Sequence, residues 1–321
     1  MSALPSGPPA SGLLVIGDVV TDVVALHDGP AVTGTDTPAD IALRPGGSGA
    51  NTASWAARLG ADVRLLARAG YDTGEWHAAE LAKAGVRPHL RMDPDRPSAV
   101  VIAMVDSTGE RSMLTNRGAS GHIGVGDWTP DLLDGVGHLH LSAYTMFAEP
   151  GLELARLAMR EAAARGVPIS VDPASRGPLR DFGPERFLRE TAAADVVIPN
   201  LEEALLLADA ADPEAAARTL SAHYGTAVVK LGAGGAVMAR DGRIVATAAA
   251  PSVEVVDSTG AGDAFAAGFL VATMAGSTPE EALRKGCEAG AAAVAQVGGR
   301  PNPGNFTLLT PIAGLRRKLH H

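Results

Sequence analysis

The chain has 321 residues, of which 46% are hydrophobic and 20% charged, so it can bury a large core in one large α/β domain or two ordinary ones. Its net charge of −9 argues against broad nucleic-acid binding, which needs a basic surface, but still allows a phosphate ligand held by backbone N–H groups and a metal ion. A single cysteine, Cys287, excludes an internal disulfide framework and a thiolate zinc site.

The first residues of the chain do not have the pattern of a signal peptide. Residues 1–11 have neither the basic start nor the apolar centre of a signal peptide, and no apolar run reaches the roughly eighteen residues that span a bilayer. We therefore expect flexible termini at 1–11 and 316–321, no membrane segment and a reducing, cytoplasmic location.

Short apolar runs that end at Gly, Asp, Asn or Pro indicate buried strands, and stretches with helical character lie between them. In chain order, the predicted strands are 13–20, 62–67, 98–105, 111–114, 138–142, 167–171, 195–198, 227–231 and the hairpin 236–246. The predicted helices are 51–59, 73–85, 151–165, 202–207, 264–272 and 279–297. This alternation predicts an α/β fold with a mostly parallel sheet covered on both faces.

Two segments interrupt the alternation of strands and helices. Residues 22–46 are rich in Thr, Asp, Gly and Pro, and residues 92–118 contain a hairpin that turns at Asp106–Glu110. We expect these segments to form an inserted small β-sheet that acts as a lid.

Polar residues follow several predicted strands directly. Asp18, Asp172, Asn200 and Gly232 each come after an apolar run. Because ligands in such folds bind beyond the carboxyl ends of the strands, the sequence places a ligand site at this edge of the sheet.

Residues 257–263 read Asp-Ser-Thr-Gly-Ala-Gly-Asp and precede an apolar helix. A Gly-Ala-Gly turn at a helix N-terminus can direct several N–H groups at an oxyanion or a phosphoryl group in transit. Asp263, in the first helical turn, could accept a proton from a substrate hydroxyl, and Asp257 could bind a cation. The alternative is an ordinary helix cap before a core helix.

A second glycine cluster, Gly46-Gly47-Ser48-Gly49-Ala50-Asn51, offers close backbone approach and an amide that both donates and accepts, as a polyhydroxylated ligand requires. Taken alone, it is equally a flexible loop and helix cap. It lacks the final glycine of a Gly-x-Ser-x-Gly nucleophile elbow, so a hydrolase that uses Ser48 is disfavoured.

Together the two clusters resemble the ribokinase-like carbohydrate kinases, the PfkB family. GGSGAN…AARLG matches the N-terminal motif of the family and DSTGAGDAFAAGFL the C-terminal one; Asn200–Glu203 fits its Asn-x-x-Glu and Val229–Gly235 its nucleotide-binding turn. The resemblance covers about residues 12–315. It implies one Rossmann-like, doubly wound domain over those residues with a small β-sheet lid.

By matching positions, the resemblance implies roles for individual residues. Asp263 would be the catalytic base, and the anion hole would be formed by Gly260, Ala261 and Gly262. The sugar would be bound by Asp22, Gly46, Gly47 and Asn51. The site for ATP and Mg²⁺ would be formed by Asn200, Glu203, Lys230, Gly232 and Gly235, with Glu203 acting on Mg²⁺ through water. Relatives often use a monovalent cation, so K⁺ is a further candidate, held by Asp257, Thr259, Val294, Val297, Gly299 and Asn302. A homodimer formed through the lid is also implied.

Several positions depart from the family pattern. Lys230 replaces a common threonine and would either contact phosphate or form a salt bridge. Residues 141–145 lack the glutamate that ribokinases use on the sugar, and Val20 stands where they place an asparagine, so ribose is disfavoured. Arg117 would hold a substrate carboxylate or form a salt bridge, and Tyr144 would line the pocket or pack in the core.

The sequence thus predicts an ATP- and Mg²⁺-dependent kinase that phosphorylates a hydroxyl of a small sugar or sugar derivative. The first alternative is a nucleoside kinase of the adenosine or pseudouridine type on the same fold. A non-catalytic sugar- or nucleotide-binding regulator is the second, and the retention of Asp263 argues against it.

Overall fold

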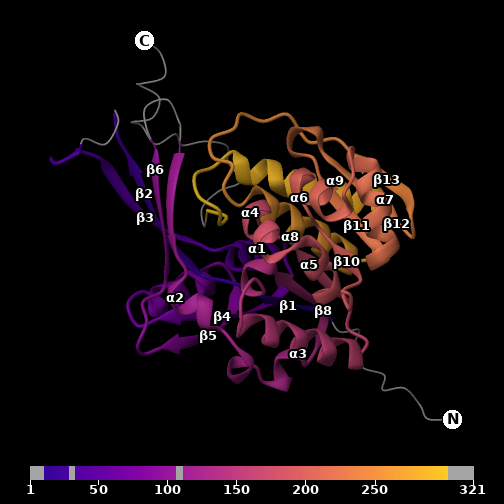
Figure 1. Ribbon diagram of the computed structural model, residues 1–321, viewed down its shortest axis with the longest axis horizontal. Helices are drawn as coiled ribbons and strands as arrows, with labels where there is room; N and C mark the ends of the chain where they lie inside the picture. The colour runs from indigo at the N-terminus through magenta and orange to yellow at the C-terminus, as the bar shows by residue number, and fades with distance from the viewer. Residues whose placement is uncertain (1–10, 29–32, 106–110, 303–321) are drawn as a thin grey trace.

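The computed structural model describes residues 11–28, 33–105 and 111–302. In this part of the chain nine strands form one large sheet and four strands form a smaller one that stands off from it (Figure 1). Residues 1–10, 29–32, 106–110 and 303–321 lie outside the described residues, so the flexible termini predicted at 1–11 and 316–321, apart from Ser11, and the turn predicted at 106–110 are not described.

The large sheet has the strand order β13-β12-β11-β10-β9-β8-β1-β4-β5. All its pairs are parallel except β11–β12 and β12–β13, which are antiparallel. Its strands are β1 (Gly12–Ile16), β4 (Asp62–Gly70), β5 (Val86–Asp93), β8 (Val136–Ser142), β9 (Ile169–Asp172), β10 (Val196–Val197), β11 (Thr226–Lys230), β12 (Ala236–Arg240) and β13 (Arg243–Ala248). The predicted mostly parallel α/β architecture is confirmed.

Helices cover both faces of this sheet. One face packs against α3 (Gly151–Ala164), α4 (Arg176–Phe182), α5 (Pro184–Glu190), α6 (Leu201–Ala208) and α7 (Pro213–Tyr224). The other face packs against α1 (Ser48–Arg58), α2 (Gly74–Lys83), α8 (Ala261–Met274) and α9 (Pro279–Val294). Because each face is covered, the central strands are apolar along their whole length, as the five fully buried residues of β1 show.

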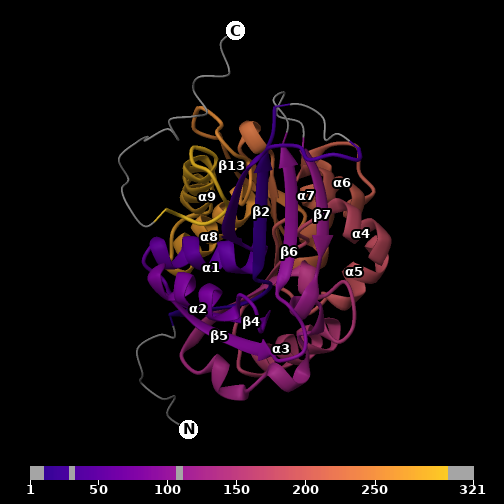
Figure 2. The ribbon, with the colours of Figure 1, turned by 90° about the vertical axis from the view of Figure 1, so that its left-hand side faces the viewer.

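The small sheet has the order β3-β2-β6-β7, from β3 (Asp40–Gly46), β2 (Val20–Leu26), β6 (Ala99–Val105) and β7 (Arg111–Asn116). The β2–β6 pair is parallel and the other two pairs are antiparallel. Figure 2 shows β2, β6 and β7 side by side, and Figure 1 shows the small sheet standing off from the large one. The sheet thus lies where the sequence predicts an insertion; that it closes as a lid stays a prediction.

Some of the observed strands and helices were not predicted from the sequence. The strand β5 and the helices α4, α5 and α7 were not predicted, and β5 brings residues 92–93, which were assigned to the lid, into the large sheet. In β5 (VRPHLRMD) charged residues and a proline interrupt the apolar run, because this edge strand is only partly covered. The helix α1 begins at Ser48 instead of residue 51, since the glycine cluster itself enters the helix.

The carboxyl ends of the parallel strands meet at one edge of the large sheet. Asp18 follows β1, Tyr144 follows β8, Asp172 and Lys230 end β9 and β11, and Asn200 follows β10. This edge faces the small sheet and carries the candidate site. None of the helices in the described ranges is long and apolar enough to cross a bilayer.

Candidate active site

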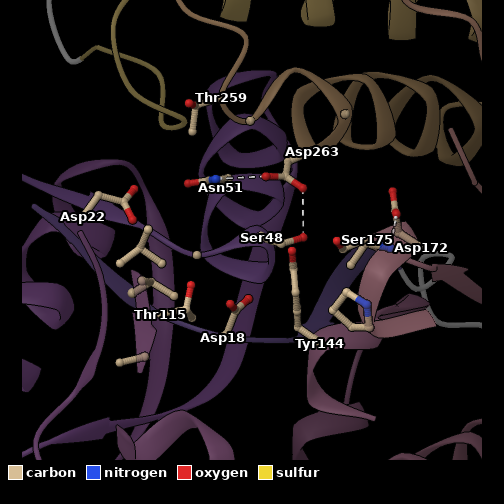
Figure 3. Close-up of a pocket in the computed structure, with 18 of the residues that line it drawn as sticks. Asp18, Asp22, Ser48, Asn51, Thr115, Tyr144, Asp172, Ser175, Thr259 and Asp263 are labelled. Atoms are coloured by element: carbon tan, nitrogen blue, oxygen red, sulfur yellow. Dashed lines mark hydrogen bonds between the residues drawn. The ribbon is translucent and has the colours of Figure 1, made fainter. Parts of the chain in front are cut away.

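A cavity of about 750 Å³ lies between the small sheet and the carboxyl edge of the large one. The small sheet contributes side chains from the face of its strands that points at the large sheet. These residues are Val20, Asp22, Ala99, Val101, Met113 and Thr115. At its other end the cavity is lined by Asp172, Asn200, Glu203, Lys230 and Gly232, and the turn 258–263 lines it between the two ends (Figure 3).

Asp263 lies between the two ends of the cavity. Its carboxylate accepts hydrogen bonds from Ser48 Oγ at 2.8 Å and from Asn51 Nδ2 at 2.9 Å (Figure 3). Ser48 and Asn51 belong to the first turns of α1, and Asp263 to the first turn of α8. The two glycine clusters of the sequence thus meet at one carboxylate.

The turn before α8 requires glycine for two reasons. Gly260 has φ 74°, in the left-handed region that side chains disfavour. A Cβ at Gly260 would also lie 2.6 Å from the Cα of Gly299, so no side chain fits there. The turn therefore keeps its backbone close to the residues that follow α9.

The pKa of Asp263 is raised to about 7. Removal of the carboxylate from water is the main cause, and the nearby charge of Asp172 adds to it. The hydrogen bonds from Asn51 and Ser48 and the charge of Lys230 act in the opposite direction. A carboxylate with this pKa holds a proton and releases it near neutral pH.

The sugar-binding candidates lie on the other side of Asp263. Asp22 points into the cavity from β2, and burial, with the like charge of Asp18, raises its pKa to about 7. Gly46 leaves space for it, because a Cβ there would overlap the Asp22 carboxylate. The Oδ1 atom of Asn51 is buried and has no hydrogen-bond partner among the described residues, so it can accept from a ligand hydroxyl.

Gly47 and Asp18 belong to the same end of the cavity. Gly47 has φ 101°, and a Cβ there would lie 2.5 Å from the carbonyl oxygen of Asp18. The carboxylate of Asp18 accepts a hydrogen bond from the Gly49 N–H at 3.1 Å. Asp18 was not predicted as a site residue; its place directly after β1 was the signal that could have identified it.

Arg117 and Tyr144 also line the cavity. The Arg117 guanidinium donates to the main-chain carbonyl of Tyr144 and forms no salt bridge with another described residue, so the contact with a substrate carboxylate stays a prediction. The Tyr144 ring meets Phe147 edge to face, with the ring centroids 6.2 Å apart. Both residues therefore stand in the cavity wall, with Arg117 oriented by the backbone.

Asn200 and Glu203 are locked to each other. Asn200 caps α6 and accepts from the Glu203 N–H, and the Glu203 carboxylate accepts from the Asn200 N–H and side-chain amide, with distances between 2.7 and 2.9 Å. Glu203 is buried, and burial together with the charge of Asp172 raises its pKa to about 7. The sequence unit Asn-x-x-Glu is thus a capping box whose carboxylate faces the cavity.

Lys230 forms a salt bridge, one of the two roles that its sequence position left open. Its ammonium lies 2.5 Å from Asp172 Oδ2; Asp172 ends β9 and Lys230 ends β11, with the short strand β10 between them. The same ammonium would lie 3.2 Å from a Cβ at Gly262, so it borders the glycine turn. Asp172 was missed as a site residue, although the sequence places it directly after a strand.

The two other glycines predicted near the nucleotide differ in position. Gly232 lines the cavity, whereas Gly235, with φ 92°, does not. Gly235 instead accepts a hydrogen bond from the Leu231 N–H at 2.8 Å and closes the turn after β11. A Cβ there would overlap the Ala248 carbonyl oxygen, so its requirement for glycine is structural.

The residues predicted for a monovalent cation surround the turn after α9. Asp257 accepts from the backbone and hydroxyl of Thr259, at 3.0 and 2.7 Å, and from the Gly298 N–H at 3.0 Å. The backbone N–H of Asp257 donates to the Val294 carbonyl. Val297, Gly299 and Asn302 belong to the same turn; the Gly299 carbonyl accepts from Trp55 Nε1 at 2.9 Å.

The carboxylates around Lys230 form a donor set that suits a magnesium–nucleotide complex. Asp172, Glu203 and Asp263 contribute three carboxylates around one ammonium, that of Lys230. In the described ranges no group of three or more His, Cys, Asp or Glu side chains forms a ready metal cage. Mg²⁺ commonly binds through one or two carboxylates plus substrate phosphates, so this donor set suits an ion that arrives with a nucleotide.

Comparison with known proteins agrees with this geometry. Residues 10–304 match the pfkB family of carbohydrate kinases. The chain is 31% identical to an ATP-dependent ribose-1-phosphate kinase from Halopiger xanaduensis over 80% of this chain and 83% of that protein. It is 28% identical to a ribokinase from Haemophilus influenzae over 89% and 93% of the two chains.

A solved structure extends the match to three dimensions. The adenosine kinase from Sinorhizobium meliloti superposes with a TM-score of 0.81 and 28% identity, covering 91% of this chain and 96% of that one. The chain thus shares its fold with a solved kinase structure over most of its length. The chain belongs to the pfkB family of carbohydrate kinases, which are ATP-dependent phosphotransferases.

Proposed function

We propose that this chain transfers the γ-phosphoryl group of ATP to a hydroxyl of a small sugar or sugar derivative. The observation that carries the proposal is the position of Asp263. Its carboxylate lies between the polar substrate end and the Lys230–Glu203 end of one cavity, in the first turn of α8. A base at that point reaches an acceptor hydroxyl while the phosphoryl donor lies on the opposite side.

The residues divide the reaction between them. Asp22, Asn51 and the backbone at Gly46 and Gly47 bind the acceptor hydroxyls, and Asp263 accepts the proton of the attacking hydroxyl. The N–H groups of Gly260, Ala261 and Gly262, at the N-terminus of α8, stabilise the charge on the transferring phosphoryl oxygens. Arg117 and Tyr144 form the wall that orients the acceptor. Phosphoryl transfer needs this positioning and neutralisation more than covalent help.

Asn200, Glu203, Lys230 and Gly232 form the nucleotide end. Glu203, held in its capping box, would hold Mg²⁺ through water, and Lys230 would contact a phosphate oxygen. When bound, Mg²⁺ supplies charge neutralisation at the phosphates. Asp257, Thr259 and the turn after α9 remain candidates for K⁺, which would act behind the anion hole.

The variant Asp263→Asn tests the base. We expect it to bind ATP as the parent does, while turnover falls by about 10³-fold, because the amide cannot accept the hydroxyl proton. ADP release in a coupled assay measures turnover, and calorimetry measures ATP binding. The exposed Asp181→Asn is the matched control. Parental turnover in Asp263→Asn would remove Asp263 from the chemistry.

The pH profile tests the environment of that base. Because Asp263 must be ionised to accept a proton and its pKa is about 7, kcat/KM should fall as the pH drops below 7 and level off above it. Ser48→Ala removes a hydrogen bond that lowers this pKa, so the acid limb should move to higher pH. A limb near pH 4 that Ser48→Ala leaves in place would contradict the assignment.

A nucleoside acceptor is the second candidate. Val101, Met113, Phe147 and Pro178 give the cavity apolar side chains against which a nucleobase could pack, and the adenosine kinase from S. meliloti is a structural relative. An ADP-release screen over ribose, fructose, keto-deoxygluconate, adenosine and pseudouridine separates the two classes. We expect the highest turnover with a sugar. Turnover with a nucleoside alone would establish the alternative. Family membership favours an enzyme over the regulator that the sequence also allowed.

The small sheet is also the proposed dimer surface. Cross-strand pairing places Leu43, Val23, Ile102 and Leu114 in one row, on the face opposite the cavity, and Leu43 and Leu114 are 63% and 60% exposed. Burying this apolar row against a second copy would remove it from water. Sedimentation velocity at micromolar concentration should show that the parent is a dimer. The double variant with Leu43→Asp and Leu114→Asp should sediment as a monomer. The control Val255→Asp, at another exposed apolar residue, should stay dimeric; a monomeric parent would overturn the proposal.

A further inference from the structure

We propose that Asp172 is a positioning residue: its carboxylate holds the Lys230 ammonium against the glycine turn and keeps it away from Asp263. The inference rests on the proposed function, since it assigns Lys230 to the phosphates of ATP. It adds a role for a residue outside both glycine motifs. Asp172 ends β9, and Lys230 ends β11, with only the short strand β10 between them.

The geometry of the pair is that of a fixed contact. Lys230 Nζ lies 2.5 Å from Asp172 Oδ2, and the two side chains are only 12% and 6% exposed. The other carboxylate oxygen, Oδ1, accepts the backbone N–H of Ala174 at 2.9 Å. Each oxygen of Asp172 thus has its own donor, so the carboxylate cannot rotate without losing a hydrogen bond.

The backbone beyond Asp172 is strained in a way that maintains this orientation. Ala174 has φ 69°, a left-handed conformation that a non-glycine residue rarely adopts, and it lines the cavity. In that conformation its N–H points back at Asp172 Oδ1. Strain retained at a cavity wall indicates that the contact it supports has a purpose there.

The charge distribution explains why Lys230 needs a partner. The Lys230 ammonium lies among Asp172, Glu203 and Asp263, and all three attract it. Its four-carbon stem is flexible, so without Asp172 the ammonium would move toward one of the other two carboxylates. On Asp263 it would form an ion pair with the base and compete with the acceptor hydroxyl for it.

The position that Asp172 imposes also serves the donor side. The ammonium borders Gly262, where the transferring phosphoryl oxygens meet the N–H groups of the turn. It has three N–H donors, and Asp172 occupies one, so others can reach a phosphate oxygen without breaking the salt bridge. The pair therefore presents an oriented positive charge beside the anion hole.

A first measurement places the ammonium. Lys230→Met should weaken ATP binding about tenfold, the value of one charge-assisted hydrogen bond, and leave AMP binding unchanged, since only the terminal phosphates lie beside Gly262. Isothermal titration with ATP and AMP in Mg²⁺ gives both constants. If Lys230→Met weakened the binding of ATP and AMP equally, or weakened the binding of neither, the position proposed for the ammonium beside the terminal phosphates would be wrong.

A double-mutant cycle then tests Asp172. Asp172→Asn and Lys230→Met should each lower kcat by about 10²-fold with ATP and the acceptor of highest turnover in the screen, while the acceptor KM stays within about twofold. The double variant should be no slower than Lys230→Met, because Asp172 acts only through the lysine. Losses that multiply in the double variant would overturn the proposal.

Folding effects are controlled in three ways. If Asp172→Asn does not fold, the double variant, which removes both charges, still tests the proposal, because its kcat can be compared with that of Lys230→Met. Asp172→Glu, which keeps the carboxylate, should recover part of kcat. Asp127→Asn breaks a comparable ion pair, in which Asp127 lies 2.9 Å from Arg68; neither residue lines the cavity. This control variant should be less stable than the parent and keep its kcat.

Failure of this inference differs from failure of the proposed function. An inactive Asp263→Asn with multiplying losses at Asp172 and Lys230 would leave the function standing and remove only the positioning role. Full turnover in Asp263→Asn would remove the function itself.

Discussion

The site depends on one carboxylate that two helix N-termini share. Asp263 in the first turn of α8 accepts from Ser48 and Asn51 in the first turns of α1, and both helices lie on the same face of the large sheet. Removal from water and the charge of Asp172 disfavour the ionised carboxylate, while the two hydrogen bonds and the charge of Lys230 favour it. The balance leaves the carboxylate with a pKa near neutrality, close to the working range of a base.

Crowded negative charge is the second constraint. Asp172 and Glu203 line one end of the cavity, Asp263 lies between the two ends, and the Lys230 ammonium is attracted by all three carboxylates. Burial first, and the like charge of Asp172 second, raise the pKa values of Glu203 and Asp263 to about 7, so the ionised forms of these carboxyls are disfavoured here. A magnesium–nucleotide complex would relieve this penalty, so an electrostatic cost in the free protein becomes binding energy for the donor.

Sequence reasoning recovered the parts of the molecule that local chemistry determines. The alternation of apolar runs was sufficient for the mostly parallel fold. The glycine motifs singled out Asp263 and Asn51, the family resemblance added Asp22, and the structure brings all three to one cavity. The strand β5 was missed because its edge position removes the apolar pattern. The Asp172–Lys230 contact was missed because it joins residues 58 positions apart, and no local pattern encodes which strand ends come close together in the sheet.

The residues that select an acceptor and those that activate it lie on separate structural parts. Asp22, Val101 and Thr115 project from the small sheet, whereas Asp263 and the glycine turn belong to helices packed on the large sheet. Mutations in the small sheet can therefore alter the acceptor pocket while the packing around the base is preserved. Such a division lets a lineage drift from one acceptor to another through soluble, folded intermediates that still hold their phosphoryl-transfer machinery.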